Sequence, residues 1–237
     1  MDLRNHFPTG ILAVLLLLVP AAHGAVVTCG VGQDYETFEE AVAFTNGNGT
    51  GADTILLTDG YYTANGNPLA VLGTLTITYA AGNTGSITIE KTANDGPVLR
   101  WGGESADPAI AGTLTVEGYS ESSPITIKNS ASNKAVIWSG FKTLNNSRLV
   151  LRNVDLEKAV AFTGPFLTWQ STPSQQCHIE NVNFVGGSPL VSGDAGDAVA
   201  ILGGLSGTLQ MAMVGCSFAQ AEASRRIYHE RLELEAQ

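Results

Sequence analysis

The sequence predicts an all-β fold, a parallel β-helix of about six turns with three short strands in each turn. Three observations predict it. Only 14% of the 237 residues are charged, while 27 glycines and frequent Thr, Ser and Asn residues supply turns and a neutral polar surface. Apolar and polar residues alternate along many short segments, which is typical of strands with one buried face. Several of these segments recur at a spacing of 38 or 39 residues.

This repeat defines the strands and their order. Thr74–Tyr79 recurs as Thr113–Gly118, and Ser86–Lys91 recurs as Pro124–Asn129. Because each segment matches one in the next repeat, we expect parallel pairing between successive turns. The third segment of the repeat is Gly96–Trp101, echoed by Lys134–Trp138 and Gly164–Trp169. Further strands are expected at Asp53–Leu57, Tyr61–Thr63, Leu69–Leu72, Arg148–Leu156, Cys177–Phe184, Thr208–Met213 and Gly215–Phe218.

Both ends of such a stack need a cap, because unpaired strand edges invite association. Thr37 and Glu40 fit a capping box, which predicts a helix at the N-terminal end. Its expected buried face is Phe38, Ala41, Val42 and Thr45, and Asn46 with Gly47 is expected to end it. The tail carries opposite charges four residues apart, which predicts a second helix. The expected divisions are an N-terminal cap at 25–52, the β-helix at 53–218 and a C-terminal tail or cap at 219–237.

Residues 1–24 have the pattern of a secretory signal peptide. A short apolar core, Ile11–Val19, is followed by the small residues Ala22 and Gly24 at the positions that precede a cleavage site. The core is about half of the ~20 residues that a membrane-spanning helix needs. We therefore expect cleavage after Gly24, no transmembrane span afterwards, and a secreted or cell-surface location.

Charge and cysteine content limit the partners and the cross-links. The formal net charge is −10 at pH 7, and no Lys or Arg lies between Lys158 and Arg225. This excludes nucleic acid, which needs basic side chains to neutralise its phosphates. The expected partner is an extracellular polysaccharide or a surface protein. Cys29, Cys177 and Cys216 allow one disulfide at most, and the last two are the favoured pair, although the strand alignment does not stack them.

Two groups of segments resemble known families. Asp34–Val42 and Asp53–Thr63 look like the entry segment of pectin-lyase-like right-handed parallel β-helix proteins. Ile179–Gly187 and Val214–Phe218 are similar to the Phe- and Gly-Gly-bearing repeats of polymorphic outer membrane proteins. The resemblance covers nearly the whole chain after the signal peptide. It implies a right-handed β-helix, and it specifies architecture rather than chemistry.

Three tryptophans form the most specific candidate site. If the repeats align on them, Trp101, Trp138 and Trp169 occupy equivalent positions in consecutive turns and form a column. Facing inward, the column belongs to the core, which the apolar residue two positions before each tryptophan favours. Facing outward, it is an aromatic platform that could bind sugar rings. These residues are therefore the candidate carbohydrate-binding site.

Titratable residues give weaker candidates. Asp194 and Asp197 lie in a Gly-rich loop and are the candidate Ca²⁺ ligands, although this ion takes roughly six to eight oxygens. Asp155 and Glu157 share one strand face and could act as acid and base, but an outward polar face explains them equally well.

Two further patterns concern a metal site and glycosylation. Cys177 and His178 are adjacent in a strand and point to opposite faces, which argues against one metal ion bound by both. Asn48 and Asn145 begin glycosylation sequons, which apply only in a eukaryotic host.

These observations predict a secreted or cell-surface adhesion or structural module without catalytic activity, and with no cofactor besides the candidate Ca²⁺. The alternatives are a polysaccharide-binding protein and a pectin-type polysaccharide lyase or hydrolase. The fold leaves them open, because one scaffold can support binding, cleavage and attachment.

Overall fold

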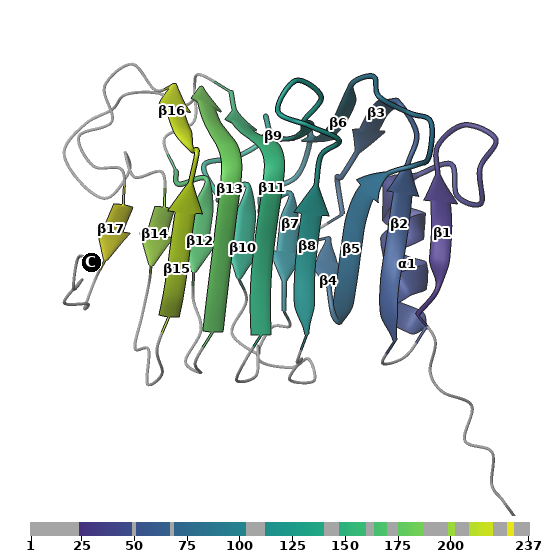
Figure 1. Ribbon diagram of the computed structural model, residues 1–237, viewed down its shortest axis with the longest axis horizontal. Coiled ribbons are helices and arrows are strands. Elements are labelled where there is room, and N and C mark those ends of the chain that lie inside the picture. The colour runs from purple at the N-terminus through teal and green to yellow at the C-terminus, as the bar shows by residue number, and fades with distance from the viewer. Residues whose placement is uncertain are drawn as a thin grey trace, which may run out of the picture.

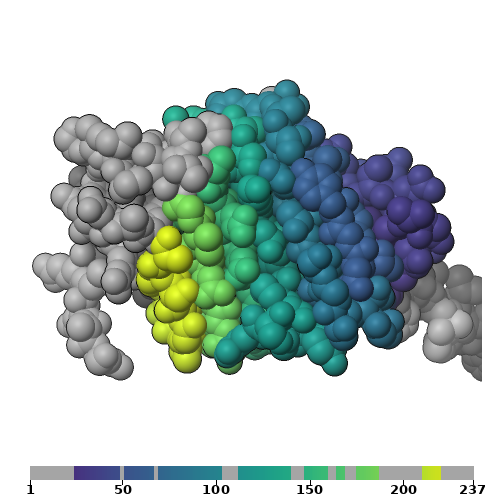
Figure 2. Space-filling model, turned by 90° about the horizontal axis from the view of Figure 1, so that it is seen from above, coloured from purple at the N-terminus to yellow at the C-terminus, as the bar shows by residue number. Residues whose placement is uncertain are grey.

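The computed structural model describes residues 24–48, 51–66, 69–102, 112–139, 147–159, 164–169, 175–186, 199–201, 209–219 and 227–229. Within these ranges the chain is mostly β with one helix, and every pairing between strands is parallel. The predicted all-β class and parallel pairing are therefore confirmed. Strands lie side by side along the long axis in Figure 1, and Figure 2 shows the described segments following one another along that axis in chain order.

The strands form three columns, where a column is a set of parallel strands stacked in register. The first column contains β1 (Val26–Cys29), β2 (Ala52–Leu57), β5 (Thr74–Tyr79), β8 (Thr113–Glu117), the first parts of β11 (Ser147–Lys158) and β13 (Gln175–Gly186), and β15 (Leu209–Val214). The second contains β3 (Gly60–Thr63), β6 (Ile87–Lys91), β9 (Ile125–Asn129), the second parts of β11 and β13, and β16 (Ser217–Ala219). The third contains β4 (Ala70–Val71), β7 (Leu99–Trp101), β10 (Ile137–Ser139), β12 (Leu167–Trp169), β14 (Val199–Ile201) and β17 (Ile227–His229). Because β11 and β13 run through the first two columns, these form one 11-stranded sheet, and the third column is a separate 6-stranded sheet.

The register follows the sequence repeat in the first two columns. Leu75 pairs with Leu114, and the β6 strand pairs with β9 as the repeat predicts. In the third column the prediction is wrong by one residue, since Leu99 pairs with Ile137 and not with Val136. Strands of three residues offer few alternating positions, so an alignment on one tryptophan had little else to fix its register.

Alternation along strands such as β5, β6, β8 and β9 separates the core from the outer face. Ile127 in β9 is fully buried, whereas its neighbour Thr126 is partly exposed. Inward-facing residues of similar type stack on one another from strand to strand. At the C-terminal end of the described stack these residues are aromatic. Phe184 in β13 stacks on Phe218 in β16 with ring centroids 4.7 Å apart, and it meets Phe166 edge-on at 5.6 Å. Such stacking buries apolar area between every pair of turns.

Asparagines bend the two long strands between the first and second columns. Asn153 in β11 and Asn181 in β13 have φ of 51° and 52°, the left-handed conformation that Asn tolerates better than most residues. Asn181 Nδ2 donates to Asn153 Oδ1 at 3.2 Å. In the next turn Gly215 has φ of 64° beside Asn181. The bend is therefore repeated in register, and side-chain bonds between turns stabilise it.

The N-terminal end of the stack is closed by a helix. The predicted helix is confirmed as α1 (Phe38–Gly47), with the expected four residues buried, and Thr37 Oγ1 accepts a bond from the Glu40 amide at 3.2 Å. Helix α1 contacts β1, β3 and β4, the first strands of the three columns, and also β2. The free edge of β1 is also occupied, because Asp34 Oδ2 accepts from the Thr28 amide at 2.8 Å and the Tyr35 amide donates to Thr28 O. These contacts block further strand pairing at this edge.

A polar row crosses the interior near the turn into the third column. Lys91, Asn129 and Lys158 are in register, and all three are buried. The Lys158 ammonium donates to the carbonyl oxygens of Asn133, Lys134 and Pro165 at 3.3, 2.8 and 3.4 Å. Burial lowers the pKa of Lys158 from its ordinary value to about 7. This lysine therefore holds the turn through backbone carbonyls while it is desolvated.

The cysteines are free thiols. Cys177 stacks on Met211 in the next turn, so the expected pair with Cys216 does not form. Burial, with a smaller contribution from Glu40, raises the pKa of Cys29 to about 12, and burial also raises that of Cys177. Both buried thiols act as small apolar core residues.

Where the structure describes the C-terminal tail at Ile227–His229, it shows a strand in place of the predicted helix. Ile227–His229 is strand β17, which pairs with β14 in the third column. An open sheet edge supplies backbone partners at once, whereas a short isolated helix has a costly nucleus. The rest of the tail after Ala219 and the predicted signal peptide up to His23 lie outside the described residues. Among the residues that are described, no helix is long and apolar enough to cross a membrane.

Candidate functional site

Polar side chains run in rows across the outer face of the first column. One row, in register across β8, β11, β13 and β15, is Thr113, Arg148, Gln176 and Gln210. The next row is Thr76, Thr115, Val150, His178 and Ala212. Neighbouring strands lie about 4.8 Å apart, so the first row presents a hydrogen-bonding group on every strand, whereas Val150 and Ala212 interrupt the second.

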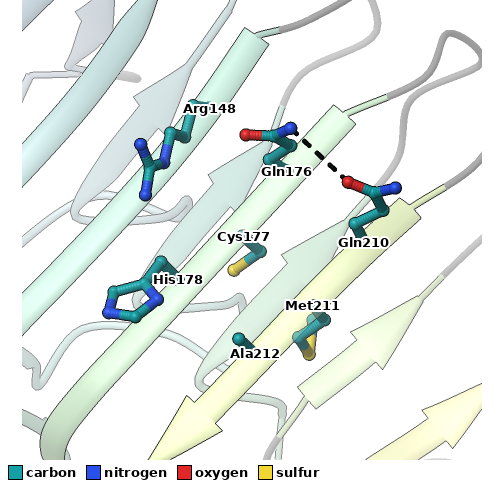
Figure 3. A pocket seen from close by; sticks show the side chains of 7 residues that line it. All are labelled: Arg148, Gln176, Cys177, His178, Gln210, Met211 and Ala212. Atoms are coloured by element: carbon teal, nitrogen blue, oxygen red, sulfur yellow. Dashed lines mark hydrogen bonds between the residues drawn. The ribbon is translucent and has the colours of Figure 1, made fainter.

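This face is hollowed where β11, β13 and β15 lie side by side (Figure 3). The hollow has a volume of about 680 Å³. It is lined by Arg148, Gln176, Cys177, His178, Gln210, Met211 and Ala212. The volume falls within the roughly 300–1,000 Å³ of small-molecule sites. One polar row, a mixed row of His178 and Ala212, and the edge of the core thus meet at one depression.

In the hollow, the hydrogen-bonding groups of Arg148, Gln176 and Gln210 are only partly bonded to other protein groups. Gln176 Nε2 donates to Gln210 Oε1 at 3.4 Å, which joins the amides of β13 and β15. Arg148 at the start of β11 is exposed, and its guanidinium forms no ion pair with any residue that the structure describes. The row therefore offers a free cation beside two amides.

A line of charged side chains connects the bend at Asn153 and Asn181 with the hollow. Arg152 lies between Glu117 and Glu180, with Nη1 and Nε at 3.7 and 3.2 Å from their carboxylate oxygens. His178 Nε2 lies 3.2 Å from Glu180 Oε2. The bond with His178, helped by Arg152, lowers the pKa of Glu180 below its usual value. A carboxylate thus orients the His178 ring at the hollow.

The candidate acid and base, Asp155 and Glu157, share the outer face of the second column. Asp155 Oδ1 accepts from Asn183 Nδ2 at 2.7 Å. Burial raises the pKa of Glu157, although the charge of Lys128 opposes the shift. Lys128 also pairs with Glu90 at 3.5 Å. Asp155 is therefore held in a bond between turns, and Glu157 belongs to a mixed cluster of charges.

Glu90 in this cluster is stabilised as an anion. Burial alone would raise its pKa, but bonds from Ser130 and Tyr61 and the charge of Lys128 outweigh burial and lower it. The Ser130 hydroxyl donates to Glu90 Oε1 across one turn. The polar face of the second column is therefore bonded largely to itself.

The predicted tryptophan column does not form. Trp138 pairs with Arg100 and Thr168, while Trp101 and Trp169 are both in register with Ser139. Adjacent positions of a strand point to opposite faces, so Trp138 faces away from Trp101. Trp101 is fully buried in the core and Trp138 is partly exposed. A platform of three tryptophans is excluded by this register, and sugar binding by Trp138 stays a prediction.

The other predicted site residues have separate outcomes. Asn48 is exposed at the end of α1, and its Nδ2 donates to Asp53 Oδ1 at 3.1 Å. The candidate Ca²⁺ ligands Asp194 and Asp197, and the sequon residue Asn145, lie outside the described residues. In the described part of the chain, no group of three or more His, Cys, Asp or Glu side chains could hold a metal ion. Cys177 is buried and His178 is partly exposed, in agreement with the expected opposite faces.

Three polar residues of the hollow were missed by sequence reasoning, which considered only Cys177 and His178 there, as a metal pair. Arg148, Gln176 and Gln210 lie 28 and 34 residues apart and become neighbours only when the register is known. No local signal marks them, because each is only one polar position within or beside an alternating strand. A comparison of the chain with protein families, with curated proteins and with solved structures finds no match.

Proposed function

We propose that the chain forms a right-handed parallel β-helix of the pectin-lyase-like type and acts as a secreted or cell-surface adhesion module without catalytic activity. Three columns of parallel strands, bends repeated in register and a helix over the first turn support this architecture. A rod of this kind presents long flat faces to an extended partner.

The outer face of the first column carries the functional proposal. Its rows repeat hydroxyl, amide and guanidinium groups across the strands, and its hollow is large enough for a small ligand unit. Hydroxyls and amides both donate and accept, which suits the hydroxyl groups of a sugar. We therefore take an extracellular polysaccharide as the partner, and a surface protein as the alternative that the same experiment tests.

Binding of the full chain to a panel of immobilised neutral and acidic polysaccharides tests this function. Thr115→Met places a long neutral side chain without a hydroxyl on the outer face of the first column and should weaken binding. Thr126→Met makes the same change on the second column and should leave binding unchanged. Polymer length, measured afterwards, should not change.

Three results would contradict the proposal. Shortened polymer or unsaturated sugar products would show a lyase or hydrolase. Equal loss in both variants would remove the first column as the site. Binding to no polysaccharide would remove the saccharide partner and leave a surface protein or a purely structural role.

A further inference from the structure

The hollow contains one cation that the fold itself does not use. Arg152, four positions further along β11, is paired with Glu117 and Glu180. Arg148 is exposed and forms no ion pair with any described residue. A guanidinium presents a planar fork of N–H donors that matches the oxygens of a carboxylate or a sulfate. The structure therefore leaves this fork open to an oxyanion from outside.

The neighbours of Arg148 suit the rest of a saccharide unit. The bond between Gln176 Nε2 and Gln210 Oε1 uses one donor and one acceptor, so each amide keeps further groups for ligand hydroxyls. Ala212 and the ring of His178, which Glu180 holds in place, line the lower part of the hollow. Amides above and apolar surface below match the mixed surface of a sugar ring.

The overall charge limits how many anionic groups the ligand carries. The chain has a formal net charge of −10, so a dense polyanion is repelled at long range. At short range one unpaired guanidinium in the hollow can neutralise one oxyanion. The ligand is therefore mainly neutral, with isolated charges.

We propose that this hollow binds a saccharide unit bearing a single oxyanion, a carboxylate or a sulfate ester, with the oxyanion on Arg148 and ring hydroxyls on Gln176 and Gln210. The inference rests on the proposed function, because it names the ligand class for the same outer face. Carboxylate and sulfate share the recognition chemistry, and the experiment separates them.

Three sugars of the same ring test the site: glucuronic acid, glucose 6-sulfate and glucose. Each is titrated into the ¹⁵N-labelled full chain at physiological salt, and Kd is read from chemical-shift changes. At least one charged sugar should bind about tenfold or more tightly than glucose, because a charge-assisted bond is worth roughly 1.5–3 kcal/mol. Arg148→Gln should weaken that binding about tenfold or more by the same reasoning. Lys128→Gln removes the same charge from the second column and should have no effect.

Several results would overturn the inference. They are equal binding of glucose and both charged sugars, unchanged binding in Arg148→Gln, and no saturable shift with either charged sugar. If Arg148→Gln changes nothing while Thr115→Met still weakens polysaccharide binding, the proposed function stands and the inference fails. If the panel shows no polysaccharide binding either, both fail. If Arg148→Gln shifts the urea midpoint, the substitution has changed stability as well as the site. Gln210→Ala, on another strand, then provides the second variant.

Discussion

Lys158 should make the stability of this protein rise with pH across neutrality. Its side chain is 3% exposed, and its bonded partners are three backbone carbonyls rather than a carboxylate. Burial lowers its pKa to about 7 from an ordinary value of 10.5. Below about pH 7 the folded state therefore carries the full cost of a buried ammonium. This cost is roughly 5 kcal/mol, because a difference of one pKa unit corresponds to about 1.4 kcal/mol.

The direction of the pH effect follows from the protonation of Lys158 in the folded and unfolded states. Between about pH 7 and 10.5 the unfolded chain keeps the Lys158 proton while the folded chain has lost it. The unfolded state then binds more protons, so the free energy of unfolding increases with pH. From about pH 6 to about pH 8.5 the gain is about 2 kcal/mol. Above that range the raised pKa of Cys29 acts in the opposite direction, because the unfolded thiol ionises first.

Urea unfolding across this pH range measures the effect. Lys158→Met removes the titrating group and should flatten the pH dependence by about 2 kcal/mol. Lys128→Met removes a lysine from the outer face of the neighbouring strand and should keep the wild-type slope. The reasoning is refuted if wild type shows no rise with pH, or if Lys158→Met rises as steeply as wild type.

Other predictions concern the bend, the core and the tryptophans. Asn181→Ala should cost about 1–2 kcal/mol in urea unfolding, because alanine disfavours the left-handed φ and loses the bond between turns; an unchanged midpoint would contradict this role. Ile127→Ala should cost about 2–5 kcal/mol as a cavity in the core, whereas Thr126→Ala on the outer face should stay within about 0.5 kcal/mol; similar costs would show that the strand faces are wrongly assigned. Trp138→Phe should lower the fraction of fluorescence that acrylamide quenches more than Trp101→Phe does, and the reverse order would contradict the register of the third column.

The sequence predicted those parts of the fold that local alternation and repetition determine. The long segments around Ile77 and Ile127 alternate over five or six residues and recur in order, so class, pairing direction and register could be predicted. Helix α1 was predicted because Thr37 and Glu40, three residues apart, form the capping box of its first turn. These features depend on contacts that the local sequence pattern already contains.

Other features depend on positions that the local pattern does not fix. Trp101 and Trp138 look equivalent, yet the third-column strands are too short to fix a register, and the structure sets them on opposite faces. Arg148 and Gln176 meet only after the turns are stacked, so no local pattern indicated the hollow. Strand β17 arises because an existing sheet edge competes with the helical tendency of the tail.

From β2 onwards, each strand pairs with the strand one turn away and not with the strand that follows it in sequence. Nuclear Overhauser effects between isotope-labelled methyl groups test it most directly at Ile127 in β9. The account predicts contacts from Ile127 to Ile89 and to Leu156, its partners in the turns before and after. Cross-strand contacts from β9 to Val116 in β8, in an antiparallel hairpin pattern and without those to Ile89 and Leu156, would contradict it.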